Sequence, residues 1–199
     1  MTNRIAGSLA LLFMASTTAA QAQSVDLSAH AVGAQWSEFA GADRGLGGRL
    51  SWKPTAVIGL EGELNWYPSA FPGEDRAFSG NRFEAVAAIT AGPRVGRIRP
   101  FVRLGAGFLQ SSAAPAPFAC IAIFPPPLHC LLAAGDTLPV VEIGGGVEIA
   151  ASARTFLRFD AVDRILRYPV PTFGPADEIS QEGFFGHAFK FSFGAGWRF

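Results

Sequence analysis

The sequence predicts an all-β protein: an eight-stranded, antiparallel, up-and-down transmembrane β-barrel preceded by a cleaved signal peptide. Three observations lead to this prediction. The 199 residues are 49% hydrophobic but only 16% charged. Apolar and polar side chains alternate over segments of about ten residues, and the connections between these segments are short and long in turn, as in outer-membrane barrels. Alternation with a period of two indicates β-strands with two different faces.

Residues 1–22 have the three-part pattern of a signal peptide. One arginine lies in the opening MTNR, the apolar run IAGSLALLFMA follows, and Ala20, Gln21 and Ala22 form a small-residue A-x-A cleavage site. The apolar run is shorter than the roughly 20 residues that a membrane-spanning helix needs. We therefore expect export, cleavage after about Ala22, and one barrel domain over residues 23–199.

The alternating segments define the strands in order. The clearest is AVIGLEGELNWYP, in which Leu60 and Leu64 share one face while Glu61 and Glu63 share the other. The first segment separates its two faces poorly. The eight strands are expected over residues 25–38, 45–53, 56–67, 82–95, 100–110, 138–150, 155–167 and 187–199.

The connections alternate in length. Short ones are expected near residues 54–55, 96–99 and 151–154, and longer ones near 39–44, 68–81, 111–137 and 168–186. Short turns on one side and long loops on the other are typical of outer-membrane barrels. An even number of strands then places both termini on the short-turn, periplasmic side.

The two faces of the strands differ in a way that indicates which one is inside. The apolar face is continuous and rich in aromatic residues, whereas the other face mixes charges with glycines, small residues that leave room for long side chains. A soluble lipocalin-like barrel, the competing interpretation, has its apolar residues inside. We therefore expect a charged lumen lined by Arg49, Lys53, Glu61, Glu63, Glu84, Arg94, Arg103, Glu142, Glu148, Arg158, Asp160, Lys190 and Arg198.

This lumen is expected to be a polar plug. Buried unpaired charges are costly, so the acidic and basic side chains should pair, and hairpin register suggests the pairs Glu61–Arg49 and Glu148–Arg158. Eight strands leave a lumen just wide enough for side chains. A narrow channel is the alternative interpretation. Aromatic girdles are expected at the outer rim (Trp36, Trp66, Tyr67) and at the periplasmic rim (Trp52, Phe101, Trp197, Phe199).

Two cysteines, Cys120 and Cys130, lie ten positions apart in the segment 111–137. In an oxidising compartment such a pair is expected to form a disulfide, and neither a C-x-x-C motif nor further metal ligands accompany it. The segment is apolar and proline-rich. It is interpreted either as a surface that contacts lipopolysaccharide or a protein partner, or as a loop packed on its own side chains.

Several chemistries find no support in the sequence. The formal net charge is zero, which argues against nucleic-acid binding. The Gly-rich stretch 144–148 lacks the Lys-Ser/Thr that follows a phosphate loop. The three histidines are scattered. We therefore expect no cofactor, no metal and no catalytic residue.

The mature chain, about residues 23–199, resembles the small eight-stranded outer-membrane barrels of the OmpA, OmpX and opacity types. The C-terminal segment is the most specific part of the resemblance: Phe199 matches the terminal aromatic residue, and Phe191, Phe193 and Trp197 match alternate preceding positions, with Ala195 a weak match. The resemblance implies an outer-membrane location among lipid and lipopolysaccharide, and an assembly signal read by the barrel-assembly machinery.

The expected function is a non-enzymatic, structural or surface-interaction role in the bacterial envelope. An outer-membrane enzyme that modifies lipid A is the main alternative, since small outer-membrane barrels can be enzymes and the lipid A deacylase family carries a His-x-Ser pair on a late strand, with an acid that orients the histidine. Here His187 is followed by Ala188 and Phe189, so the nucleophile is missing. His187 is expected at the rim of the last strand without a chemical role.

Overall fold

The computed structural model describes residues 23–37, 42–68, 81–112, 137–168 and 184–199, and these form eight antiparallel strands. The strands are β1 (Ser24–Trp36), β2 (Ala42–Lys53), β3 (Ile58–Tyr67), β4 (Arg82–Ala91), β5 (Ile98–Ser111), β6 (Thr137–Ala150), β7 (Thr155–Tyr168) and β8 (Phe184–Arg198). Among these residues, no helix is long and apolar enough to cross a membrane.

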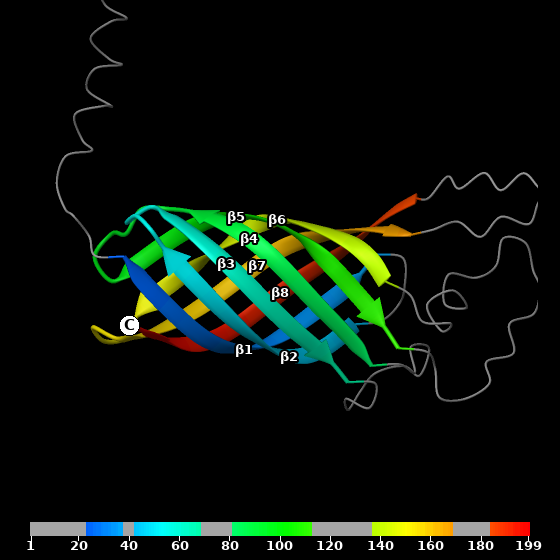
Figure 1. The fold of residues 1–199 in the computed structure, drawn as a ribbon, viewed down its shortest axis with the longest axis horizontal. Coiled ribbons are helices and arrows are strands. Elements are labelled where there is room, and N and C mark those ends of the chain that lie inside the picture. Colours follow the sequence, from blue (N-terminus) through cyan, green and yellow to red (C-terminus); the bar gives the residue numbers. More distant parts are fainter. Residues whose placement is uncertain (1–22, 38–41, 69–80, 113–136, 169–183) are drawn as a thin grey trace, which may run out of the picture.

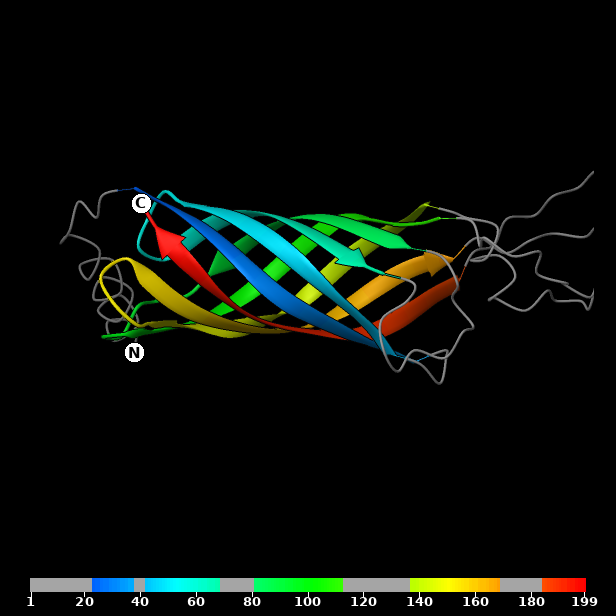
Figure 2. The ribbon, with the colours of Figure 1, turned by 90° about the horizontal axis from the view of Figure 1, so that it is seen from below.

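The strands follow one another around a closed barrel, in which β8 pairs back to β1 (Figures 1 and 2). The register sets Leu27 opposite Trp197 and Ala31 opposite Phe193. Closure gives every strand two hydrogen-bonded neighbours and leaves no edge. The predicted fold class, an eight-stranded up-and-down barrel, is confirmed.

The short connections lie at one end of the barrel, together with the C-terminus and the start of β1 (Figure 1). They cover residues 54–57, 92–97 and 151–154. The predicted strand over 82–95 is too long: β4 ends at Ala91, because Gly92 and Pro93 follow and proline has no N–H for the ladder. Gly96, with φ 62°, then completes a tight turn in which Val95 and Ile98 bond to each other.

The residues that are not described lie before β1 and in the longer connections. The predicted signal peptide, the pair Cys120–Cys130 and nearly all of the segment 111–137 lie outside the described residues. These predictions are therefore not tested by the structure.

Along most of the barrel, large apolar residues face outward and charged residues face inward, while toward the long-loop end a buried apolar group that includes Leu109, Leu138 and Leu166 also fills the interior. In β3, Leu64 is 54% exposed while its neighbour Glu63 is 1% exposed. The same alternation runs through β8, where Phe191 and Phe193 are exposed and Lys190 and Ser192 are buried. This is the reverse of a soluble barrel, whose apolar side chains fill the interior.

Three of the aromatic residues expected in the girdles lie instead inside the barrel. Trp36, Tyr67 and Phe101 are all buried. Residues two apart in a strand share a face, and Phe101 therefore shares its face with the inward Arg103. The Phe101 ring centroid is 4.3 Å from the guanidinium carbon of Arg158. Trp52, Trp66, Trp197 and Phe199 are on the outside, as the girdle prediction requires.

Candidate functional site

The lumen contains the largest group of charged side chains in the described part of the chain. Charged residues reach it from all eight strands. Those that are buried are Asp26, Asp43, Arg49, Lys53, Glu61, Glu63, Arg82, Glu84, Arg99, Arg103, Glu142, Glu148, Arg158, Asp160, Arg164 and Lys190. This set contains as many acidic as basic residues, so it is balanced if all are ionised.

Inward glycines let these long side chains fit. A Cβ placed on Gly144 would lie 2.3 Å from the carbonyl oxygen of Ala161, and one on Gly107 would lie 1.9 Å from that of Ala85. No side chain can occupy those positions without moving the neighbouring strand. Glycine at these sites therefore lets the strands pack closely while the charged residues beside them fill the lumen.

A central cluster forms around Glu61 and Glu63. Arg49 Nη2 and Arg103 Nη1 each lie 2.6 Å from Glu63 Oε2. Arg158 donates to Glu61 through both terminal nitrogens, at 2.5 and 2.9 Å, and also to Asp160. Such forked guanidinium–carboxylate contacts are the strongest and most directional ion pairs that side chains make.

A second cluster lies toward the long-loop end, around Glu84. Lys190 Nζ is 2.6 Å from Glu84 Oε1 and 3.0 Å from Glu63 Oε1, and it also contacts Glu142. Arg164 Nη1 is 2.6 Å from Glu84 Oε2. The Tyr67 hydroxyl donates to the same carboxylate at 3.1 Å. Glu63 joins this cluster to the central one.

A third cluster lies at the short-turn end. Lys53 Nζ is 2.6 Å from Asp26 and 2.7 Å from Glu148. Arg198 contacts the same two carboxylates. Arg94 reaches Glu148 at 3.2 Å from the turn between β4 and β5. Arg94 was expected on a strand, but its place in the turn leaves its side chain 35% exposed.

The predicted pairings are only partly those that the structure contains. Arg49 lies 3.8 Å from Glu61 but is closer to Glu63. Arg158 stands opposite Glu148 in the register, yet its ion pairs go to Glu61 and Asp160. Opposed residues on adjacent strands point into the lumen side by side, and long side chains then reach further, across the lumen.

Sequence reasoning missed several lumen residues: Asp26, His30, Asp43, Arg82, Arg99 and Arg164. Three of them had a usable signal. Arg82 precedes Glu84 by two positions, Arg99 precedes Arg103 by four, and Arg164 follows Asp160 by four, so all three share an inward face already identified. Asp26 and His30 lie in the strand whose faces could not be separated.

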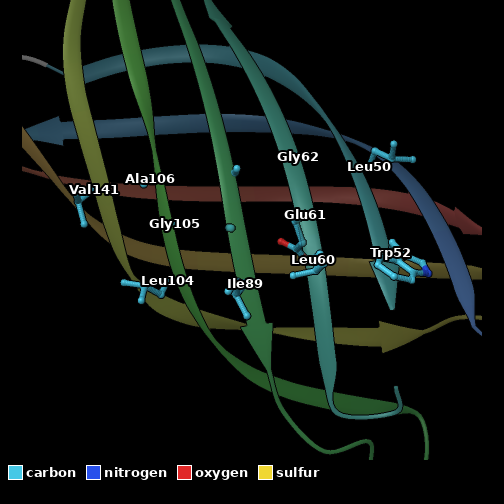
Figure 3. Close-up of a pocket in the computed structure, with 12 residues that line it drawn as sticks. Leu50, Trp52, Leu60, Glu61, Gly62, Ile89, Leu104, Gly105, Ala106 and Val141 are labelled. Atoms are coloured by element: carbon cyan, nitrogen blue, oxygen red, sulfur yellow. The ribbon is translucent and has the colours of Figure 1, made fainter. Parts of the chain in front are cut away.

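The outer wall is hollowed where three small residues meet. Gly62, Ala87 and Ala106 stand opposite one another on β3, β4 and β5. Larger side chains, among them Leu60 and Leu104, surround a depression of about 720 Å³ (Figure 3). Gly62 faces outward, and a Cβ there would meet nothing within 4 Å.

His187 and Asp163 are placed as an ion pair on the outer wall, toward the long-loop end. His187 Nδ1 lies 2.9 Å from Asp163 Oδ2, and both side chains are exposed. The Ser37 hydroxyl donates to the His187 carbonyl oxygen at 2.7 Å. Among the described residues, no group of three His, Cys, Asp or Glu residues is arranged to hold a metal ion.

Comparison with known proteins gives a match in structure but not in sequence. No family model matches the chain, and no curated protein matches it significantly. Neisserial surface protein A (NspA) matches with a TM-score of 0.52 and 13% identity, over 92% of this chain and 100% of that one. The N-terminal barrel domain of Pseudomonas aeruginosa OprF has a TM-score of 0.49, with 14% identity over 87% and 97% of the two chains.

A further solved structure, the attachment invasion locus protein Ail of Yersinia pestis, has a TM-score of 0.41, with 13% identity over 89% and 97% of the chains. At these identities the likeness concerns the fold alone, and the NspA match, with a TM-score above 0.5, supports it. The chain thus has the fold of the small eight-stranded outer-membrane barrels. This confirms the resemblance at the level of the fold.

Proposed function

We propose that the protein is an integral outer-membrane barrel with a structural or surface-contact role, and that its lumen neither conducts ions nor carries out catalysis. The outward wall supports the membrane placement, because its exposed side chains are mainly Leu, Ile, Val, Phe and Trp from every strand. An apolar surface of this extent is unfavourable in water. In a bilayer the same surface is favourable, and the closed barrel pairs the backbone N–H and C=O groups of its strands internally, as any membrane-spanning segment must.

The observation that carries the proposed plug is a set of ion pairs between opposite walls. Arg158 on β7 bonds to Glu61 on β3, and Lys190 on β8 bonds to Glu84 on β4. In a closed ring of eight strands, each of these pairs joins strands four positions apart. The side chains therefore meet across the lumen instead of lining an open path, as expected for so narrow a barrel.

Planar-bilayer recording tests the plug. The wild-type protein is expected to give no steady unitary conductance. The double variant Arg103→Ser/Arg158→Ser removes two guanidinium groups from the central cluster, and it is expected to conduct and so serves as the positive control. Reproducible conductance steps from the wild type would contradict the proposal. Heat-modifiable gel migration establishes that both proteins are folded before recording.

Cell fractionation tests the location separately. The mature protein is expected in the outer-membrane fraction, with lipid and lipopolysaccharide around its apolar wall, and recovery in the soluble periplasm would contradict this. The proposal includes the signal peptide 1–22, the disulfide Cys120–Cys130, a surface contact through 111–137, and recognition of Phe191, Phe193, Trp197 and Phe199 by the barrel-assembly machinery. Each rests on the sequence.

The pair His187–Asp163 favours a second candidate, an enzyme that modifies lipid A. A carboxylate on Nδ1 orients an imidazole as in a nucleophile–base–acid triad, and the pair lies on the outward wall. The position two residues after His187 is Phe189, which supplies no nucleophile. Turnover of labelled lipid A that is lost in His187→Ala and Asp163→Asn would support the enzyme, and absence of turnover by the wild type would exclude this candidate.

A further inference from the structure

A small cavity of about 160 Å³ opens at the short-turn end of the lumen, and we call it the mouth cavity. Four cationic side chains line it: Lys53 from β2, Arg94 from the β4–β5 turn, Arg99 from β5 and Arg198 from β8. Thr55 contributes a hydroxyl group from the β2–β3 turn. The cavity therefore gathers basic groups from four separate parts of the chain.

The acidic partners of these four cations are too few to neutralise them. Within the described ranges, every ion pair that the four make ends on one of two carboxylates, Asp26 or Glu148. Four positive and two negative charges leave an excess of two positive charges around the cavity. The linked central and Glu84 clusters differ, since five cations there share five carboxylates. A low-dielectric wall around such an excess concentrates anions.

Arg99 has a donor left over at this cavity. Its side chain is almost completely buried, at 1% exposure for the residue. Its Nε donates to the Gly92 carbonyl at 3.2 Å, and its Nη2 donates to the Val57 carbonyl at 3.1 Å. Its Nη1 has no hydrogen-bond partner, and the nearest paired carboxylate oxygen, on Glu148, is 3.9 Å away. Leaving a buried charged donor unsatisfied is costly, so this N–H favours an acceptor in the cavity.

We propose that the mouth cavity binds a small oxyanion of the phosphate class. Guanidinium groups match phosphate oxygens through forked hydrogen bonds, and three of the four cations here are arginines. The Thr55 Oγ accepts from the backbone nitrogens of Val57 and Ile58, which leaves its O–H free to donate. The cavity is several times the roughly 30 Å³ that one water occupies in the liquid, so a tetrahedral anion fits.

The same chemistry is offered by free phosphate and by the phosphodiester of a phospholipid headgroup. The second source depends on the proposed membrane placement, since headgroups would then lie level with the barrel mouth. The first does not depend on it. Binding by the folded protein in neutral detergent micelles can therefore succeed or fail independently of the proposed function.

Isothermal titration calorimetry at low ionic strength tests the site with two probes, inorganic phosphate and glycerophosphoglycerol, the acyl-free headgroup of phosphatidylglycerol. We expect saturable binding that Arg99→Gln weakens about tenfold and Arg94→Gln about fivefold, as lost charge-assisted hydrogen bonds do. The matched control is Arg97→Gln, an exposed arginine in the same turn as Arg94 that does not line the cavity. It should change the affinity less than about twofold, because exposed charges are screened.

Arg94 is partly exposed, so its replacement leaves folding intact and keeps the test decisive if Arg99→Gln does not refold. Tighter binding of the diester than of phosphate assigns the site to lipid headgroups, and equal or weaker binding assigns it to free phosphate. Absence of saturable binding of both probes, or equal weakening by Arg97→Gln and Arg94→Gln, would overturn the proposal. Gel mobility before and after boiling confirms that each variant is folded.

Discussion

Glu63 and Leu64 are neighbours in β3, yet they lie in opposite environments. Glu63 is buried and contacts Arg49, Arg103 and Lys190, whereas Leu64 points away from the barrel and is more than half exposed. On the inward face each charge is paired with an opposite charge. On the outward face, no described residue forms an ion pair near Leu64, and this apolar surface fits the proposed bilayer. The comparison teaches that one strand can serve two media when its side chains alternate with a period of two.

The two faces should also respond differently to substitution. Removing one partner from a buried ion pair leaves an uncompensated charge, while the pair as a whole can be replaced with little loss. Leu64 has no such partner among the described residues, and in the proposed membrane placement lipid would fill the space that a smaller side chain leaves. Substitutions at neighbouring inward and outward positions therefore show how differently the two faces contribute to the free energy of unfolding.

The largest effect is expected for Glu63→Gln. This change keeps the shape of the side chain but removes the charge that three cations share, so we expect a loss of about 3–5 kcal/mol in the free energy of unfolding. Urea titration in lipid vesicles, followed by tryptophan fluorescence, measures it. The control is Leu64→Met, a swap of similar volume that should cost less than about 1.5 kcal/mol. Similar losses at both positions would mean that the central cluster does not hold the barrel together.

A charge placed on the outward face should have the next largest effect. Leu104 lies near the middle of β5 and faces outward. Leu104→Arg is expected to cost about 2–4 kcal/mol, as arginine does at the midplane of a bilayer. Val95→Arg, in the turn after β4, should cost about 0–1 kcal/mol by the same depth dependence. Equal costs at the two depths would contradict the proposed membrane span.

The alternation also explains what could be predicted from the sequence. Strand number, turn positions and the inward face of Glu61, Glu142 and Lys190 all follow from period two, and the structure places these residues in the lumen. Arg99 and Phe101 were predictable by the same rule, since both share a face with Arg103. Arg99 lies one residue before the predicted start of the strand at position 100, and Phe101, close to that start, was assigned to the periplasmic girdle.

Other features could not be predicted from the sequence. Arg158 pairs with Glu61 because its side chain reaches across the lumen. The two residues are almost a hundred positions apart in the chain. Asp26 was missed because small Ala, Ser and Gly residues on both faces of its strand give no hydrophobic contrast. Neither the pairing of residues across the lumen nor the mouth cavity leaves a pattern in neighbouring residues of the sequence.

Two glycines on opposite faces give the third comparison. Gly144 faces inward, and a Cβ there would lie 2.3 Å from a backbone oxygen of the neighbouring strand. Gly144→Ala must therefore displace β7, and we expect a loss of about 1–3 kcal/mol, the usual cost of overpacking. Urea titration of the folded barrel measures this loss. A neutral result would mean that the strand spacing adapts without cost.

Gly62→Ala is the matched outward change and should have the smallest effect. A Cβ at Gly62 meets nothing within 4 Å, because the site opens on the hollow of the outer wall. Alanine also restricts the unfolded chain more than glycine, which stabilises a protein by about 0.4–1 kcal/mol where the backbone conformation is compatible. The same titration is expected to show a small gain in stability. A loss comparable to that of Gly144→Ala would show that the hollow is filled in the membrane by a tightly packed neighbour, and the two faces would then no longer differ in how strictly they are packed.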